Sequence, residues 1–149
     1  MTRRVGPCVV DASAIVPVVA NDSSSVRADR WFEGAQATLE DSLTVDLFDA
    51  ECANALWKRV RWAPWPIEVA EAALDRVLAL PVRRVSLGVV VGDALRLAVT
   101  SELSVYDACY VALAVASGLP LVTADRRLAN AARKAGCDAL CLTEEAAAP

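Results

Sequence analysis

The stretch Ser117-Gly118-Leu119-Pro120-Leu121-Val122-Thr123-Ala124-Asp125 decides the fold, because a helix ends, a strand passes and a new helix begins within nine residues. Gly118 predicts the end of the preceding helix, and the apolar run from Leu119 to Thr123 predicts a buried strand. A short apolar strand between two helices is typical of a parallel sheet covered on both faces. Asp125 follows this strand by two residues, where the next helix is expected to start.

The rest of the chain repeats this alternation of short strands and helices. Further strands are expected at residues 8–10, 82–85 and 139–142, and residues 37–43 suggest a second short strand. Caps and prolines predict helices from Ser13, from the polar run Asn21–Ser25 to Gly34, from Thr44 to Trp62, from Pro66 to Leu80, from Ser86 to Thr100, from Ser104 to Ser117 and from Asp125 to Ala135. The sequence therefore predicts a single α/β domain over residues 1–149, with a frayed tail at about 144–149.

Composition narrows the class of protein. With 149 residues, 56% of them hydrophobic, the chain fits one domain with a substantial core and is not expected to be disordered. The longest uncharged run, residues 108–124, is shorter than a membrane span. Asp11 and Pro17 interrupt the apolar stretch that a signal peptide would need. We expect a soluble, cytoplasmic protein without a membrane segment.

Cysteine and histidine usage narrows the chemistry. The five cysteines are odd in number and form no C-x-x-C pair, and Cys52 and Cys109 lie among small and aliphatic residues, which favours buried thiols. The chain has no histidine, which excludes Ser-His-Asp and Cys-His nucleophilic sites and makes zinc improbable. Hydrolysis by this chain would have to use carboxylates, metal and water.

Four acidic residues stand in nearly apolar segments: Asp11, Glu51, Asp107 and Asp125. Carboxylates are rarely buried without compensation, and no Lys or Arg is adjacent to the first three. A shared divalent cation such as Mg²⁺ or Mn²⁺ would compensate them. Asp11 and Asp125 follow strands whose carboxyl ends share one edge of a parallel sheet, Asp107 lies in the first turn of its helix, and Glu51 lies about two turns inside its own helix.

Basic residues near these acids suggest contacts with phosphate groups. Asn54 and Lys58 share a helix face with Glu51, and Lys58 would lie roughly 10 Å from Glu51 along the axis, where a neighbouring phosphate would fit. Arg126 and Arg127 follow Asp125 directly, so they would either contact flanking phosphates or be solvated helix residues. The net charge of −4 equals the charge of the four acids, so a cation bound there would leave the remaining surface roughly neutral.

Each acid also has a purely structural explanation. Asp107 completes a Ser104-x-x-Asp107 capping box, Asp125 would cap the last helix, and Asp11 would form a turn after its strand. Glu51 has the weakest such explanation, because it lies between apolar residues within a helix. The aromatic group Trp57, Trp62 and Trp65 is expected to pack in the core, with a dimer or other protein interface as the alternative.

The segments around these acids resemble a known family. In order and spacing, Val9–Ala14, Glu51–Leu56, Tyr106–Ala114 and Leu121–Leu128 resemble PIN-domain ribonucleases, and most closely the VapC-type toxins of toxin–antitoxin pairs. The resemblance implies a three-layer α/β/α PIN-like domain with a short, mostly parallel central sheet. It also implies a Mg²⁺- or Mn²⁺-dependent endoribonuclease that binds one or two ions, forms a homodimer and has its active-site groove covered by a small antitoxin.

In that family the positions matching Asp11, Glu51, Asp107 and Asp125 form the metal site, and those matching Ser13 and Thr123 often orient it. The hypothesis is an in-line attack of water on the scissile phosphorus that leaves a 5′-phosphate and a 3′-hydroxyl. Asp46 and Asp49 depart from the family pattern and would alter RNA approach or metal occupancy.

Three other assignments compete with the toxin. A housekeeping PIN nuclease of RNA processing would share the acids but lack an antitoxin, and a noncatalytic binding module would lack cleavage. A phosphoacyl site of the haloacid-dehalogenase type is disfavoured, because Asp11-Ala12-Ser13 lacks a second aspartate. The sequence leaves open the RNA target, the number of ions, the general base and the identity of the antitoxin.

Overall fold

The protein is described by a computed structural model that covers residues 5–22 and 25–144. Its centre is a five-stranded parallel sheet in the order β3-β2-β1-β4-β5. The strands are β1 (Val9–Val10), β2 (Leu43–Val45), β3 (Arg83–Val85), β4 (Leu121–Thr123) and β5 (Ala139–Cys141). The helices are α1 (Ala12–Val19), α2 (Val26–Ala35), α3 (Phe48–Trp62), α4 (Ile67–Leu78), α5 (Leu87–Ser101), α6 (Val105–Ser117) and α7 (Arg126–Lys134), with a 3₁₀ turn at Gln36–Asp41.

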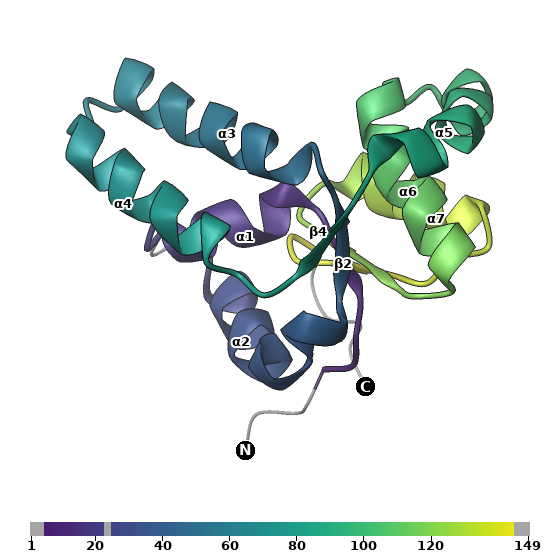
Figure 1. Ribbon diagram of the computed structural model, residues 1–149, viewed down its shortest axis with the longest axis horizontal. Coiled ribbons are helices and arrows are strands. Elements are labelled where there is room, and N and C mark those ends of the chain that lie inside the picture. The colour runs from purple at the N-terminus through teal and green to yellow at the C-terminus, as the bar shows by residue number, and fades with distance from the viewer. Residues whose placement is uncertain (1–4, 23–24, 145–149) are drawn as a thin grey trace.

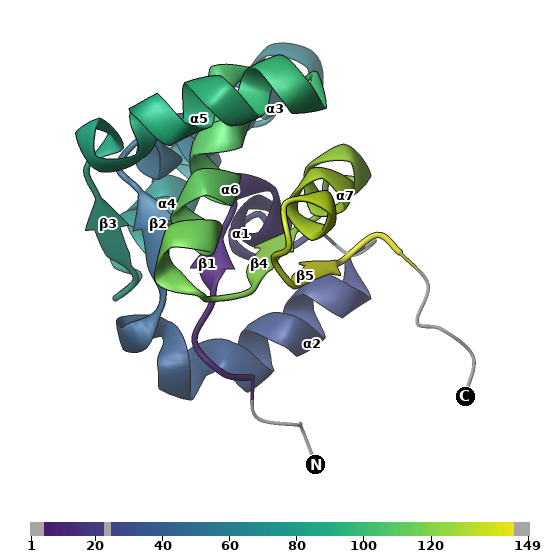
Figure 2. The same cartoon turned by 90° about the vertical axis from the view of Figure 1, so that its right-hand side faces the viewer.

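Two hydrophobic clusters cover the two faces of the sheet. Alternate residues of a strand point to opposite faces, so Val10 and Val122 join the cluster of α1–α4, whereas Val9 and Leu121 join the cluster of α5–α7. Figure 1 shows the first group of helices on one side of the strands and the second group on the other. Figure 2 shows the strands across the sheet in the order β3-β2-β1-β4-β5. The predicted three-layer α/β/α architecture with a parallel sheet is confirmed.

Helix α6 is the most deeply buried helix beside the sheet. All residues from Ala108 to Ala114 are buried, which explains why the sequence of this helix is apolar on every side. Its ends are set locally: the Ser104 side chain accepts a hydrogen bond from the Asp107 N–H, and Gly118 has a φ of 69°. Glycine adopts this left-handed conformation without strain, so α6 stops where β4 must begin.

The second strand and the third helix start later than the sequence predicted. Residues 37–43 were predicted as a strand, but Gln36–Asp41 form a 3₁₀ turn and β2 begins at Leu43. The Thr38 hydroxyl stabilises this turn by donating to the carbonyls of Val5 and Ala35. The expectation that Thr44 caps α3 is also wrong, because Thr44 is buried within β2, between β1 and β3, and donates its hydroxyl to the Val10 carbonyl.

The later start of α3 moves Glu51. The helix begins at Phe48, and the Glu51 N–H bonds to the Leu47 carbonyl, so Glu51 lies in the first turn and not two turns inside the helix. The first turn of α3 follows β2 closely, which brings Glu51 near the carboxyl edge of the sheet. The correction therefore places Glu51 nearer to the other acids than the predicted helix did.

The remaining boundaries agree with the sequence within a few residues. The five cysteines are free thiols, and all but Cys137 are buried. Glu144, the first residue of the predicted frayed tail, is instead held by Arg133 at 2.9 Å. Residues 145–149, Arg3, Arg4, Ser23 and Ser24 lie outside the described residues.

In the described ranges no single helix has the length and apolarity to cross a membrane, although α5 and α6 pass that test as a pair bent by 113°.

Candidate active site

The four predicted acids line one cavity at the carboxyl edge of the sheet. This cavity, which we call the acid cavity, has a volume of about 410 Å³ and is lined by Asp11, Ala12, Ser13, Val16, Pro17, Glu51, Asn54, Ala55, Lys58, Asp107 and Asp125. Asp11 and Asp125 follow β1 and β4, which pair as neighbours, and Asp107 and Glu51 come from the first turns of α6 and α3. The parallel sheet thus brings together residues that are far apart in sequence.

Asp11 is the most buried acid and the most firmly held. It is 5% exposed. Its Oδ2 accepts hydrogen bonds from the Ser13 hydroxyl at 2.5 Å and from the Thr123 hydroxyl at 2.7 Å. Each hydroxyl oxygen in turn accepts a backbone N–H, from Ala124 at 2.8 Å and from Asp125 at 3.0 Å. Both hydroxyl hydrogens therefore point to Asp11, and Ser13 and Thr123 fix its carboxylate.

Burial still dominates the ionisation of Asp11. Loss of hydration raises its pKa, the bonds from Ser13 and Thr123 oppose the rise, and the charge of Asp107 adds to it. Lys58 is the one cationic side chain among the described residues that line the cavity, and it is exposed to solvent. The orientation of the Asp11 carboxylate is thus fixed by hydrogen bonds, while no arginine or lysine forms an ion pair with it among the described residues.

Among the four acids, Glu51 has a carboxylate oxygen whose hydrogen-bonding capacity is not satisfied. Its Oε1 is buried and has no hydrogen-bond partner, and burial with the charges of Asp11 and Asp107 raises its pKa to about 7. The Tyr110 hydroxyl lies near enough to Glu51 to oppose part of that rise, but the two groups do not meet in hydrogen-bond geometry, and the hydroxyl is also unpartnered. A buried carboxylate oxygen without a partner requires a proton or a cation.

Asp107 and Asp125 perform structural tasks without using their whole carboxylates. The Asp125 Oδ1 accepts the N–H groups of Arg127 at 2.8 Å and Leu128 at 3.4 Å, so the predicted cap of the last helix is confirmed. In the described chain its Oδ2 takes no part in this cap. The Ser104 hydroxyl caps the Asp107 N–H at 3.1 Å, but no bond from the Asp107 carboxylate back to Ser104 occurs among the described residues. Both acids therefore keep carboxylate oxygens for the cavity.

The donor set suits a hard divalent cation that retains water. Across residues 5–22 and 25–144, no three Asp, Glu or Cys side chains form a ready-made set of metal ligands. The carboxylates thus line one cavity without converging on one point. Mg²⁺ accepts such a set, because it binds through one or two carboxylates and keeps several of its waters. The unpartnered Glu51 oxygen and the four carboxylates of the lining fit this ion better than one that requires a full protein cage.

Comparison with known proteins agrees with this geometry. The family model described as PIN domain matches residues 8–134. The chain belongs to the PIN-domain family. It is 39% identical to "Ribonuclease VapC3" of Pyrobaculum aerophilum over 82% of this chain and 92% of that protein. It is 36% identical to "Ribonuclease VapC3" of Mycobacterium tuberculosis, over 83% and 85% of the two chains.

Two further comparisons refine the likeness. "Exonuclease VapC9" of Pyrobaculum aerophilum is 34% identical over 80% of this chain and 81% of its own. The crystal structure of PAE2754 from the same organism superposes with a TM-score of 0.64 at 29% identity, covering 90% of each chain. The predicted family and PIN-like fold are thereby confirmed.

The predicted basic residues of this PIN domain lie in different places. Asn54 and Lys58 line the acid cavity with Glu51, as their spacing on α3 predicted. Arg126 instead donates to the Thr143 carbonyl at 3.3 Å, and Arg127 lines a separate cavity between α5 and α7. The sequence placed both arginines beside Asp125, but successive helix residues diverge by about 100°.

The two additional acids before Glu51 also lie outside the acid cavity. Asp46 accepts the Leu87 N–H at 3.2 Å and so supports the start of α5. Asp49 forms a paired contact with Arg84, whose Nη2 lies 2.8 Å from Asp49 Oδ1. Their carboxylates are engaged in the PIN domain's structure.

Sequence reasoning missed Tyr110 and misjudged two tryptophans. Tyr110 is three residues after Asp107, so a helical face would have placed it near the acids. The prediction of core packing is wrong for Trp57 and Trp62, which are 52% and 67% exposed and meet edge to face at 5.4 Å. Trp65 does pack against the core and lies under the Arg59 guanidinium at 5.3 Å.

Proposed function

We propose that this chain is a Mg²⁺- or Mn²⁺-dependent endoribonuclease that hydrolyses RNA phosphodiester bonds in the acid cavity. The observation that carries the proposal is the buried Glu51 oxygen, which has no partner in a cavity that Asp11, Asp107 and Asp125 also line. A shared cation would compensate these groups together. The names of the VapC relatives, which call them ribonucleases, support RNA as the substrate.

The residues of the cavity divide the work of such a reaction. Ser13 and Thr123 hold Asp11 in one orientation, and α7 holds one oxygen of Asp125, so two acids are fixed before substrate binds. Bound ions, one or two in number, would acidify water and stabilise the leaving oxygen. Lys58, on the Glu51 face of α3, would bind a phosphate next to the cut and orient the strand.

A cleavage assay tests this proposal. Purified protein is incubated with a structured RNA pool in Mg²⁺, Mn²⁺ or EDTA, and the cut ends are mapped. We expect metal-dependent cuts that leave 5′-phosphate and 3′-hydroxyl ends. Because one relative is named an exonuclease, a circular RNA should be included, since only an endonuclease opens it. Cleavage that persists in EDTA would refute the proposal. Absence of cleavage in both Mg²⁺ and Mn²⁺ would also refute it and would favour a noncatalytic binding module.

We further propose that the protein is the toxin of a toxin–antitoxin pair and that an antitoxin binds along α3. The exposed Trp57 belongs to a small apolar groove of about 150 Å³ between α3 and α4, whereas Asn54 and Lys58 on the same helix face the acid cavity. A polypeptide that lies along α3 could therefore bury the tryptophan and reach the acids.

A homodimer is part of this proposal. Val91, Leu95 and Val99, spaced four residues apart on α5, are all exposed and offer an apolar stripe for a second copy.

Growth experiments separate the toxin from a housekeeping PIN nuclease. Expression alone should stop growth, and co-expression of a short neighbouring gene product that binds the protein should restore it. An Asp11→Asn variant should be harmless in the same assay. Normal growth with active wild-type protein would instead favour RNA processing.

A further inference from the structure

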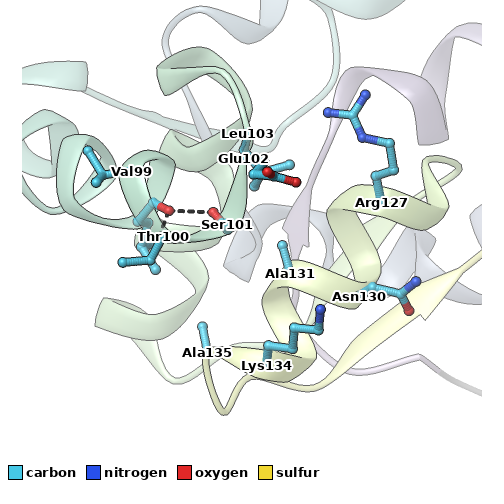
Figure 3. Close-up of a pocket in the computed structure, with 11 residues that line it drawn as sticks. Val99, Thr100, Ser101, Glu102, Leu103, Arg127, Asn130, Ala131, Lys134 and Ala135 are labelled. Carbon is cyan, nitrogen blue, oxygen red and sulfur yellow. Dashed lines mark hydrogen bonds between the residues drawn. The ribbon is translucent and has the colours of Figure 1, made fainter.

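A second cavity has no role in the proposed cleavage reaction, and of the apolar stripe proposed for a second copy only Val99 lines it. It occupies about 710 Å³ between the end of α5 and one face of α7. Figure 3 shows its two walls, with Glu102 on the α5 side and Arg127, Asn130 and Lys134 on α7. This volume lies in the range of pockets that hold small ligands, about 300–1,000 Å³. We call it the α5–α7 cavity.

Three charged side chains line this cavity, and none of them is engaged. Arg127 and Lys134 lie on one face of α7, and the Glu102 carboxylate is turned toward that face (Figure 3). Within the described chain the side chains of Glu102, Arg127 and Lys134 form no hydrogen bond or ion pair. Two cations and one carboxylate thus face the same space without neutralising one another.

The backbone at Glu102 supports a specific role. Its φ is 56°, in the left-handed region, at the C-cap of α5. Asparagine and glycine suit this conformation, and another side chain there is disfavoured by roughly 1 kcal/mol. The glutamate at this position is therefore not explained by the helix end itself, and it places a carboxylate in the cavity.

The floor of the cavity is apolar. Leu103 and Ala131 are buried below it, and Leu97 contributes from α5. A nucleotide base could lie on these side chains while its polar edge contacts Glu102. The backbone phosphates of the same nucleotide would then contact Arg127 and Lys134. Single-stranded RNA is recognised in this way, through unstacked bases whose edges are hydrogen-bonded.

The two cavities have no lining residue in common, but neighbouring backbone segments connect them. The Arg127 N–H donates to the Asp125 carboxylate at 2.8 Å, and Leu103 precedes Ser104, which caps Asp107. The α5–α7 cavity therefore shares two chain segments with the acids. An RNA strand that leaves the acid cavity on the side of Asp107 and Asp125 would meet the α5–α7 cavity.

We propose that the α5–α7 cavity binds one unpaired base of the RNA strand next to the cut, and that guanine is preferred. This inference rests on the proposed ribonuclease function and adds the subsite that selects a base. Guanine offers adjacent N1–H and N2–H donors that match both oxygens of the Glu102 carboxylate. Cytosine and adenine present one amino donor beside an acceptor that the carboxylate repels. Arg127 and Lys134 contact the phosphates of the same strand.

A binding assay tests the site without relying on cleavage. Asp11→Asn protein is titrated with labelled uridine oligonucleotides that carry a single guanosine, inosine, adenosine or cytidine. We expect guanosine to bind about tenfold more tightly than inosine, which lacks the second donor, and Glu102→Gln to remove most of this difference. Arg127→Met and Lys134→Met should weaken all oligonucleotides alike and each lower the salt slope by about 0.7.

Two control variants separate recognition from folding. Glu102→Gly removes the carboxylate but relieves the left-handed backbone, so it should unfold at the same or a higher temperature and still lose the guanosine preference. Arg30→Met removes one exposed arginine from α2, on the opposite face of the sheet, and should leave RNA binding unchanged.

The outcomes distinguish the site from the proposed function. If all four oligonucleotides bind equally, or if Glu102→Gln leaves the preference intact, the cavity is no base subsite. A change of oligomeric state in the cavity variants, with RNA binding unaltered, would overturn the inference in favour of a protein interface. If wild-type protein binds guanosine through the cavity yet cuts no RNA, the subsite stands and the nuclease proposal fails.

Discussion

Asp49 and Glu51 lie two residues apart in the first turn of α3, yet their surroundings are opposite. Arg84 donates three hydrogen bonds to the Asp49 carboxylate and three more to the carbonyls of Val77, Leu80 and Val82. Its guanidinium also lies 5.9 Å from the centre of the buried Phe48 ring. Glu51 has no such cation and keeps a buried oxygen without a partner.

The two acids show that a carboxylate at the start of α3 is either paired within the framework, as Asp49 is, or left with an unpartnered oxygen, as Glu51 is. Arg84 joins the start of α3, the end of α4 and β3, so the Asp49 pair stabilises the framework. In the acid cavity, by contrast, no arginine of the described chain forms an ion pair with a carboxylate. We infer that the unpaired acids are kept for a ligand, and four predictions test this contrast.

The largest effect is expected from Asp11→Asn. Removing the most buried carboxylate should lower RNA cleavage by about a thousandfold or more, because a cation that stabilises the transition state contributes several kcal/mol. The variant should remain folded, since asparagine can still accept the bonds from Ser13 and Thr123. Cleavage rates and thermal unfolding of both proteins check this. Retained metal-dependent cleavage would remove Asp11 from the site.

Arg84→Met should reduce stability by about 2–3 kcal/mol. The loss removes the Arg84 donors from Asp49 and from the carbonyls of Leu80 and Val82, whereas the Val77 carbonyl keeps the Leu80 N–H. Both partners of the ion pair are less than a third exposed. Urea unfolding measures the change, and adding Asp49→Asn to the variant should recover part of it. A change below about 0.5 kcal/mol would show that the pair is worth no more than a surface contact.

The pH dependence of stability should reveal Glu51. Its folded pKa of about 7 lies above its ordinary value of 4.5, so the folded state binds more protons between these values, and stability falls as pH rises through them. Metal-free protein should therefore lose stability from pH 4.5 to 7, and Glu51→Gln should flatten this slope. A slope that is unchanged in the variant would place the titration elsewhere.

The smallest effect is expected at the surface. Arg96 and Asp93 pair at 2.9 Å on α5, but their side chains are 80% and 67% exposed. Arg96→Ala should change the free energy of unfolding by about 0.5 kcal/mol or less, because such pairs are screened by water. A loss comparable with that of Arg84→Met would show that burial does not explain the contrast.

The sequence predicted the layers of the fold well, because apolar strands, caps and Gly118 act locally. It failed between residues 36 and 48. The Thr38 hydroxyl bonds to Val5, which is distant in sequence, and so stabilises a 3₁₀ turn in place of a strand. Pairing of β2 with two neighbours outweighed the capping signal of Thr44. Within the site, the apolar surroundings of the four acids and their positions after strands or near helix starts were enough to predict that they line one cavity. The role of Arg84 and the position of the Arg127 side chain depend on packing between elements distant in sequence, so the sequence did not indicate them. Tyr110 could have been found, because its spacing from Asp107 places it on the helix face near the acids.

Calorimetric titration of metal-free wild-type protein with Mn²⁺ near pH 7 tests the central claim most directly. The account predicts that Mn²⁺ binds, releases protons from the acid cavity and raises the unfolding temperature, and that Asp11→Asn loses all three effects. Wild-type protein that binds no Mn²⁺ at millimolar concentration, or an Asp11→Asn variant that binds it equally well, would contradict the account.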